Sequence, residues 1–384
     1  MSEKFNLSDE TYLVRGASLG DERTGAISFP IYQSATFKHP GLNMSTGYDY
    51  SRVQNPTREE LEKTINILEE GYDCLAFSTG VSAITACIQL FKSGDHFIVS
   101  EDLYGGTYRL FTETYAGFGV KADFIDTSIA SEVEKGIKEN TKAIFIETPS
   151  NPLMRVTDIQ SISNICKKYD LLLIVDNTFL SPYFQKPIRF GADIVIHSGT
   201  KFIGGHNDVL AGLLVVNSSE LSKRLRMIHM GTGAILAPFD AWLLIRSLKT
   251  LHIRLERSQN NATKVANYLN SNKNIKKVYY VGLKEHNGYE INKKQSTGVG
   301  SMISFSVKEE KLVEKILGGL KVISFAESLG GTESLITYPF TQTHVDMPED
   351  LKNRLGVDRK LLRLSIGVEN IEDLLNDLKN ILED

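Results

Sequence analysis

The sequence predicts an α/β fold with a mostly parallel sheet, preceded by an extended arm and followed by a smaller α+β unit. Between residues 57 and 246, short apolar runs that end in polar residues alternate with amphipathic stretches, as in parallel strands joined by helices. From about residue 247 this alternation gives way to separate strands and helices. Residues 1–56 contain Gly, Pro, Ser and Asn throughout and show little periodicity, which indicates an irregular arm. We therefore expect three parts: 1–56, 57–246 and 247–384.

Composition argues against several classes of protein. With 384 residues, 41% of them hydrophobic, the chain can build two or three domains. Its net charge of −4 gives no reason to expect nucleic acid as a partner. Cys74, Cys87 and Cys166 form no metal-ligand spacing, so we expect no metal and reduced cysteines. No apolar run approaches the ~20 residues that span a bilayer, and the first residues lack a signal core, so we expect a cytoplasmic protein without membrane contact.

The arm ends in an aromatic and polar stretch that contains Tyr50 and Arg52. Residues two apart in an extended chain point the same way, so these two could bind a phosphate together. A surface strand that leads into a helix is the alternative. The helix that follows is expected to begin at a capping box of Thr57 and Glu60 and to bury an apolar stripe that includes Leu68.

A turn of small residues follows the first predicted strand, residues 74–77. Gly80 and Val81 lie where this turn enters a helix, and free backbone N–H groups at a helix start favour an anion. We assign these two amides to a phosphate, although many α/β folds contain such a turn with nothing bound.

Two further strands, 96–100 and 143–147, lead into polar loops. Tyr104 follows the first strand and can either stack on a flat ring or pack within its loop. Asn151 follows the second strand and can either donate to a ring hydroxyl or serve as a turn residue before Pro152.

Asp176 and Lys201 carry the strongest chemical signal. Asp176 ends the apolar run 171–175, so it should lie at the carboxyl end of a central strand, where its carboxylate can keep a pyridine nitrogen protonated or cap the next helix. Lys201 follows another apolar run in a loop with Ser198 and Thr200. The two hydroxyls can bind a phosphate while the amine forms a Schiff base, which suits pyridoxal phosphate (PLP), although a solvated lysine loop has the same pattern.

The C-terminal unit contains one charge in an apolar context. Arg363 interrupts an expected strand, and its guanidinium needs an anionic partner, either a substrate carboxylate or a structural salt bridge. The loop 327–335 is polar and rich in glycine, which suits backbone contact with a ligand. The other elements expected after Lys201 are strands at 210–216, 277–281, 302–307 and 361–366, one long helix over 237–257, and a final helix over 371–382.

Together these motifs resemble the Cys/Met-metabolism family of PLP-dependent enzymes, which have fold type I. The resemblance covers nearly the whole chain. It rests on Tyr50-x-Arg52-x-x-Asn55-Pro56-Thr57, Tyr104-Gly105-Gly106-Thr107, Glu147-Thr148-Pro149-Ser150-Asn151-Pro152, Asp176-Asn177-Thr178, and Ser198-Gly199-Thr200-Lys201 with Gly204-Gly205-His206 after it.

The resemblance implies a catalytic set of Lys201, Asp176 and Tyr104. Lys201 would form the Schiff base with PLP, Asp176 would pair with the pyridinium nitrogen, and Tyr104 would stack on the ring and help Lys201 to carry protons. The other cofactor contacts would be Asn151 at the ring hydroxyl, Gly80, Val81, Ser198 and Thr200 at the phosphate, and Tyr50 and Arg52 reaching in from a neighbouring subunit.

The resemblance also implies a substrate site and an oligomer. Arg363 and Ser328 match positions that fix the α-carboxylate, and Arg109 and Glu327 match positions near the distal end of cystathionine-type substrates. A dimer would be the catalytic minimum, and the family is usually a dimer of dimers.

Within the family, the sequence favours a cystathionine γ-synthase. Methionine γ-lyases usually have Cys at the position of Gly106 and an apolar residue at that of Glu327, so that activity is disfavoured. Residues 45–50, 233–240 and 338–344 look most like bacillus-type cystathionine γ-synthases that also accept sulfide. We expect replacement of the γ-acyloxy group of an O-acyl-L-homoserine by L-cysteine. A cystathionine β- or γ-lyase is the alternative, and a PLP fold without turnover is a third that the intact catalytic set argues against.

Overall fold

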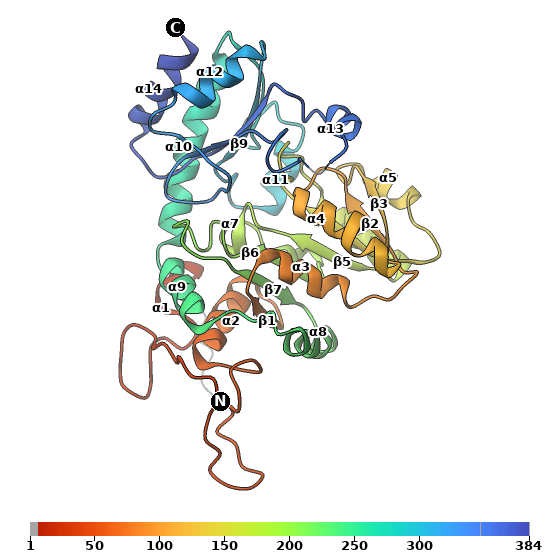
Figure 1. Ribbon diagram of the computed structural model, residues 1–384, viewed down its shortest axis with the longest axis vertical. Coiled ribbons are helices and arrows are strands. Elements are labelled where there is room, and N and C mark those ends of the chain that lie inside the picture. The colour runs from red at the N-terminus through yellow and green to blue at the C-terminus, as the bar shows by residue number, and fades with distance from the viewer. Residues whose placement is uncertain (1–6, 346, 384) are drawn as a thin grey trace.

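The computed structural model describes residues 7–345 and 347–383, which form two β-sheets with helices around them (Figure 1). The larger sheet has seven strands, and β7 runs antiparallel to both of its neighbours while the other neighbouring pairs are parallel. This confirms the predicted α/β class and the mostly parallel sheet. In spatial order the strands are β1 (Asp73–Phe77), β7 (Gly212–Val216), β6 (Ile194–Ser198), β5 (Leu172–Asp176), β4 (Thr141–Glu147), β2 (His96–Ser100) and β3 (Lys121–Ile125).

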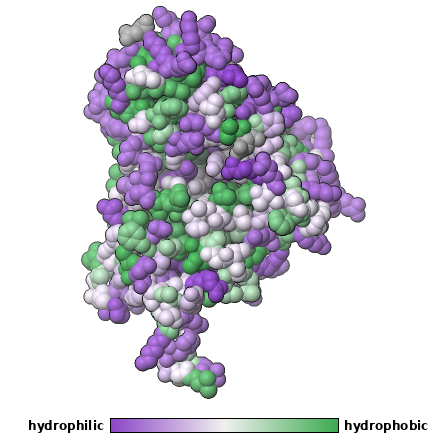
Figure 2. Space-filling view, in the orientation of Figure 1, coloured by the Kyte–Doolittle hydropathy of each residue, from purple (hydrophilic) through white to green (hydrophobic). Residues whose placement is uncertain are grey.

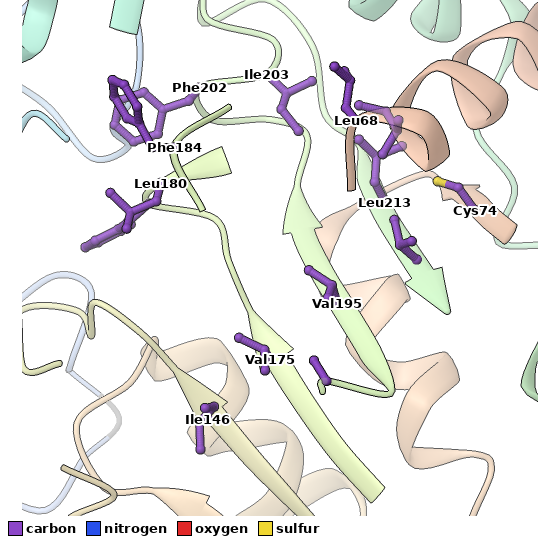
Figure 3. Close-up of a cluster of buried hydrophobic side chains, with 14 of the residues drawn as sticks. Leu68, Cys74, Ile146, Val175, Leu180, Phe184, Val195, Phe202, Ile203 and Leu213 are labelled. Atoms are coloured by element: carbon purple, nitrogen blue, oxygen red, sulfur yellow. The ribbon is translucent and has the colours of Figure 1, made fainter. Parts of the chain in front are cut away.

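Both faces of this sheet are buried, because alternate residues of each strand enter different clusters. Ile146, Val175 and Val195 belong to one cluster, which also contains Leu68 of α2 (Pro56–Glu69) (Figure 3). Their neighbours in sequence belong to the cluster of the opposite face, with Ile84 of α3 (Gly80–Ile88). Burial on both sides explains why these strands read as continuous apolar runs. It leaves the carboxyl ends of the strands as the place where polar side chains can gather.

Further helices complete the larger unit. They are α4 (Gly105–Arg109), α5 (Ala130–Lys135), α6 (Ile159–Tyr169), α7 (Ser181–Phe184), α8 (Ser219–Thr232) and α9 (Pro238–Leu248). Cys87 and Cys166 are buried in α3 and α6, and Cys74 is buried in β1.

The second sheet is smaller and lies beyond the long helix α10 (Leu251–Ser271), in the upper part of Figure 1. Its five strands are, in spatial order, β10 (Ser324–Phe325), β11 (Leu335–Thr337), β12 (Leu361–Ser365), β9 (Met302–Val307) and β8 (Ile275–Tyr279). The sheet shares a core with α10, α12 (Lys311–Gly319) and α14 (Ile371–Leu382). The remaining helices there are α11 (Tyr289–Gln295) and α13 (Glu349–Leu355).

The N-terminal part contains α1 (Asp9–Arg15) and then irregular loops that project from the body (Figure 1). Hydrophobic side chains are exposed on this projection in Figure 2, and the exposed fraction of Leu42 is 93%. The expected boundaries at residues 56 and 246 stay predictions, and the second of them falls inside α9. No helix among the described residues has the length and apolar content needed to cross a bilayer.

Two local expectations were wrong. The helix expected over 237–257 is two helices, α9 and α10, and the second continues to Ser271. The capping box of Thr57 and Glu60 does not form, because Asn55 caps α2 and its Oδ1 accepts from Thr57 N at 3.0 Å. The side chains of Thr57 and Glu60 instead form hydrogen bonds with the N-terminal arm. The Thr57 hydroxyl donates to Pro30 O at 2.9 Å, and Glu60 accepts from the backbone N–H of Ser18.

Candidate cofactor site

A cavity of about 310 Å³ lies at the carboxyl ends of β4, β5 and β6. In an open α/β sheet this is where ligands bind. The cavity brings together residues from seven separate segments of the chain. The predicted site residues among its lining are Gly80, Val81, Tyr104, Asn151, Asp176, Ser198, Thr200 and Lys201.

One end of the cavity suits a phosphate. Helix α3 begins there at Gly80, and a Cβ on this residue would lie only 3.0 Å from the Cβ of Ser198. The helix start and the end of β6 therefore pack directly together, with the free amides and the positive end of the helix dipole facing the cavity. The hydroxyl of Thr200 bonds to the backbone of Ala211, accepting from its N–H at 3.0 Å. A phosphate would share that hydroxyl with the backbone.

The amine of Lys201 lies at the centre of the site. Its Nζ donates to the hydroxyl of Ser328 at 3.0 Å. Burial and, to a lesser extent, the positive charge of Arg363 lower the pKa of Lys201 to about 8, against the opposing effect of the negative charge of Glu327. An amine with this pKa is partly neutral near physiological pH and can attack a carbonyl.

Asp176 and Glu147 form a pair of buried carboxyl groups at the ends of β5 and β4. They are partners in the strand register. Asp176 Oδ1 accepts from the N–H of Thr178 at 3.0 Å and from its hydroxyl at 2.6 Å, and burial raises the pKa of Asp176. Burial and the charge of Asp176 raise the pKa of Glu147 well above its ordinary value. Because the hydrogen bonds from Thr178 favour the charged form of Asp176, we expect Asp176 to be the anion that can hold a pyridinium.

Glu147 is one of the lining residues to which sequence reasoning gave no role in the site. Its Oε2 accepts from the backbone N–H of Tyr104 at 2.9 Å, so it fixes the segment that carries the expected stacking ring. The signal was present in the sequence. Glu147 ends its apolar run in the same way as Asp176 ends the next one.

Arg363 approaches the cavity from β12 and is only 1% exposed. It donates to Asn151 Oδ1 at 2.8 Å, to Ser328 O at 3.0 Å and to the Thr337 hydroxyl at 3.2 Å. Burial lowers the pKa of Arg363 to about 10. Within residues 7–345 and 347–383 it makes no salt bridge, and its Nε is buried without a hydrogen-bond partner. A buried cation in this state can accept an external carboxylate.

Six predicted site residues are not part of the cavity lining of this single chain. Ser328 and Arg363 contact the lining residues Lys201 and Asn151, and the other four lie farther away. Tyr50 is 46% exposed, and the guanidinium of Arg52 lies 5.5 Å from its ring centroid. Arg52 also donates to the carbonyl of Met230 at 2.9 Å. Arg109, at the end of α4, and Glu327 are exposed. In the part of the chain that the structure describes, no cluster of His, Cys, Asp or Glu side chains could hold a metal ion.

Comparison with known proteins explains this combination of an amine, an acid and a helix start. The family model described as "Cys/Met metabolism PLP-dependent enzyme" matches residues 10–383. The chain belongs to this family. Enzymes of the family depend on PLP, and the donor set of the cavity fits that cofactor: an amine of lowered pKa, a carboxylate for a ring nitrogen, and a phosphate cradle.

Relatives within the family carry different activities at the same similarity. The cystathionine gamma-lyase of Bacillus subtilis is 48% identical, with 98% of this chain and 100% of the relative covered. The cystathionine gamma-synthase of Haemophilus influenzae is also 48% identical, with 96% of each chain covered. The crystal structure of cystathionine gamma-lyase from Lactobacillus plantarum, complexed with L-serine, is 41% identical with a TM-score of 0.95, covering 98% of this chain and 100% of that one. These matches confirm fold type I and the family.

Proposed function

We propose that the enzyme replaces the γ-acyloxy group of an O-acyl-L-homoserine with L-cysteine, forming L-cystathionine for methionine biosynthesis, and that sulfide can take the place of cysteine. The observation that supports this most is the loop that carries Glu327 and Ser328. Ser328 contacts both Lys201 and Arg363, and the charge of the exposed Glu327 acts on both. The carboxylate of Glu327 suits the ammonium group of a second amino acid. A γ-replacement by cysteine requires such a second substrate.

Each residue of the site has a separate role in the proposed reaction. PLP, when bound, supplies an electron sink for the carbanion at the substrate Cα. Asp176 keeps the ring nitrogen protonated, and Lys201, partly neutral at its lowered pKa, removes the Cα proton. Tyr104 borders the same cavity and is the second candidate to carry protons. Arg363, which makes no salt bridge among the described residues, holds the α-carboxylate.

We infer that the arm completes the site of a neighbouring subunit in a homodimer or homotetramer. Tyr50 and Arg52 lie outside the cavity of their own chain, on a projection that also exposes Leu42 and Met44. A second copy would bury this apolar surface and bring the tyrosine and the guanidinium to its phosphate end. Arg109 would lie near the distal end of the substrate. A cytoplasmic location stays a prediction from the sequence.

A product assay tests the proposed reaction. Purified enzyme is incubated with O-acetyl- or O-succinyl-L-homoserine and cysteine, and cystathionine is measured, with Lys201→Ala as the inactive control. Cystathionine should form with at least one ester and in excess over 2-oxobutyrate. If neither ester yields cystathionine while cystathionine itself is rapidly cleaved, the proposal is wrong.

A cystathionine γ- or β-lyase is the second candidate, and the similarity to the Bacillus subtilis cystathionine gamma-lyase favours it. Removal of the Cα proton by Lys201 is common to both reactions, so the same cavity suits either. Cleavage of cystathionine would release ammonia with 2-oxobutyrate for the γ-lyase or with pyruvate for the β-lyase. Comparing kcat/KM for this cleavage with that for cystathionine formation separates the candidates.

A further inference from the structure

The segment 338–344 lies between β11 and α13 and is one of the three segments that resemble bacillus-type cystathionine γ-synthases. It has no role in the reaction proposed above. It ends in His344, which is 1% exposed and lies outside the lining of the cavity. Its ring is nevertheless in contact with two loops that do line it.

The hydrogen bonds of His344 define its tautomer. Nε2 lies 3.2 Å from the carbonyl oxygen of Leu103 and 3.2 Å from that of Asn151. Because carbonyl oxygens only accept, Nε2 carries the hydrogen and is shared between them. Nδ1 lies 2.8 Å from the hydroxyl of Thr343, which donates to it. Burial lowers the pKa of His344 to about 4, so this neutral ring persists at physiological pH.

The two carbonyls belong to the loops that carry the expected ring contacts. Leu103 precedes Tyr104 directly, and Asn151 is itself the expected partner of the ring hydroxyl. A Cβ on Gly105 would collide with the carbonyl oxygen of Thr343, so the segment also packs against the backbone just beyond Tyr104. The side chain of Asn151 is meanwhile held by Arg363. One ring therefore connects two cavity loops that are about 50 residues apart in the chain.

We propose that His344 is a positioning residue, which fixes the loops of Tyr104 and Asn151 relative to each other and thereby sets the orientation of the bound cofactor ring. A buried donor shared by two carbonyls restrains both loops at once, whereas an apolar side chain of similar size would leave both carbonyls unpaired. The proposal rests on the cofactor contacts proposed for Tyr104 and Asn151, and it does not depend on whether the enzyme is a synthase or a lyase.

Three variants test it in the PLP-loaded enzyme. His344→Leu fills the space without a donor, His344→Gln places an amide N–H near the position of Nε2, and Thr343→Val removes the hydroxyl that orients the ring. The matched control is His96→Gln, because His96 is equally buried, lies 2.9 Å from the Thr141 hydroxyl, and begins β2 at the end away from the cavity.

The readouts are the visible circular dichroism of bound PLP, the Kd of PLP, and amide hydrogen exchange at residues 103–107 and 150–153. His344→Leu should weaken PLP roughly tenfold, reduce the dichroic band and speed exchange in both loops. Thr343→Val should give the same changes with smaller amplitude, His344→Gln should restore PLP affinity to within roughly threefold, and His96→Gln should leave all three readouts unchanged.

The proposal is overturned if His344→Leu keeps the wild-type dichroic band and loop exchange. If that variant does not fold, an unchanged band and unchanged exchange in Thr343→Val overturn it instead. Tyr104→Ala and Asn151→Ala are measured in parallel. If neither of them alters the band, the assumed cofactor contacts are wrong, whereas exchange in the PLP-free protein still reports whether His344 restrains the loops.

Discussion

The carboxyl pair Glu147 and Asp176 allows a quantitative prediction. Neighbouring strands lie about 4.8 Å apart, and at an effective dielectric constant of about 20 two negative charges at that distance repel by about 3.5 kcal/mol. This corresponds to about 2.5 pKa units and adds to the larger effect of burial, so one of the two groups is expected to hold a proton at neutral pH. The two hydrogen bonds from Thr178 stabilise the charge on Asp176, so the proton belongs to Glu147.

Glu147→Gln is therefore expected to retain activity. A protonated Glu147 carries no charge, so replacing it with an amide removes none. The amide oxygen can still accept from the Tyr104 N–H, and kcat/KM at neutral pH should therefore stay within roughly threefold of wild type. Asp176→Asn removes the anion that pairs with the pyridinium. Losing an interaction of about 3 kcal/mol should lower kcat/KM roughly 100-fold. Steady-state kinetics of the two variants, each saturated with PLP, make the comparison.

The same pair predicts how stability changes with pH. The folded protein raises the pKa of Glu147 above its ordinary value of 4.5, so the folded state binds this proton more tightly than the unfolded chain. The stability that this group contributes is full below that value and is lost as pH rises through the folded pKa. Between about pH 5 and pH 9, Tm should consequently fall less in Glu147→Gln than in the wild type. If Glu147→Gln is as inactive as Asp176→Asn while PLP is bound, Glu147 is charged in the working enzyme and the reasoning is refuted.

Three further predictions follow from the other charges of the site. The rate of PLP capture by the PLP-free enzyme should rise with pH up to a pKa of about 8 for Lys201, and stopped-flow absorbance measures it; a rate independent of pH would contradict the lowered pKa. Arg363→Met should raise KM for the amino-acid substrate roughly 100-fold, because the guanidinium has no ion pair among the described residues and can bind a carboxylate; an unchanged KM places the carboxylate elsewhere. Mixing Lys201→Ala and Arg52→Ala subunits after reversible dissociation should restore activity, since each hybrid dimer would contain one complete site; no recovery in mass-verified hybrids excludes a shared site.

The parts of the site that sequence alone could predict are those that local chain direction determines. Asp176 and Lys201 each follow an apolar run, and parallel strands bring such ends to one edge of the sheet, so their meeting could be predicted without coordinates. Arg363 was conspicuous because a charge interrupts an apolar strand. Its partner Asn151 was not predictable as a contact, because 212 residues separate the two and nothing local specifies how the two sheets dock.

The same distinction explains the errors. The helix expected over 237–257 is interrupted between α9 and α10 although no Gly or Pro lies there. Arg254, near the start of α10, donates to the carbonyls of Phe202 and Ser247, so tertiary bonds accompany the break. Likewise, the capping box does not form because the side chains of Thr57 and Glu60 form hydrogen bonds with residues of the distant arm. For Tyr50 and Arg52, the sequence does not determine whether they contribute to the cofactor site of their own chain or to that of a neighbouring copy.

The contacts of Ser328 connect the chemistry of the larger sheet to substrate recognition by the smaller one. Its hydroxyl accepts from Lys201, which follows β6, and its carbonyl accepts from Arg363, which lies in β12. The backbone of Ser328 has φ +115, a conformation that only a well-packed loop maintains in a residue with a side chain. A substrate whose carboxylate binds Arg363 and whose amine reaches the position of Lys201 therefore spans the same two sheets as this residue. If Arg363 and Lys201 act as proposed, recognition of the carboxylate and removal of the Cα proton would therefore depend on one loop.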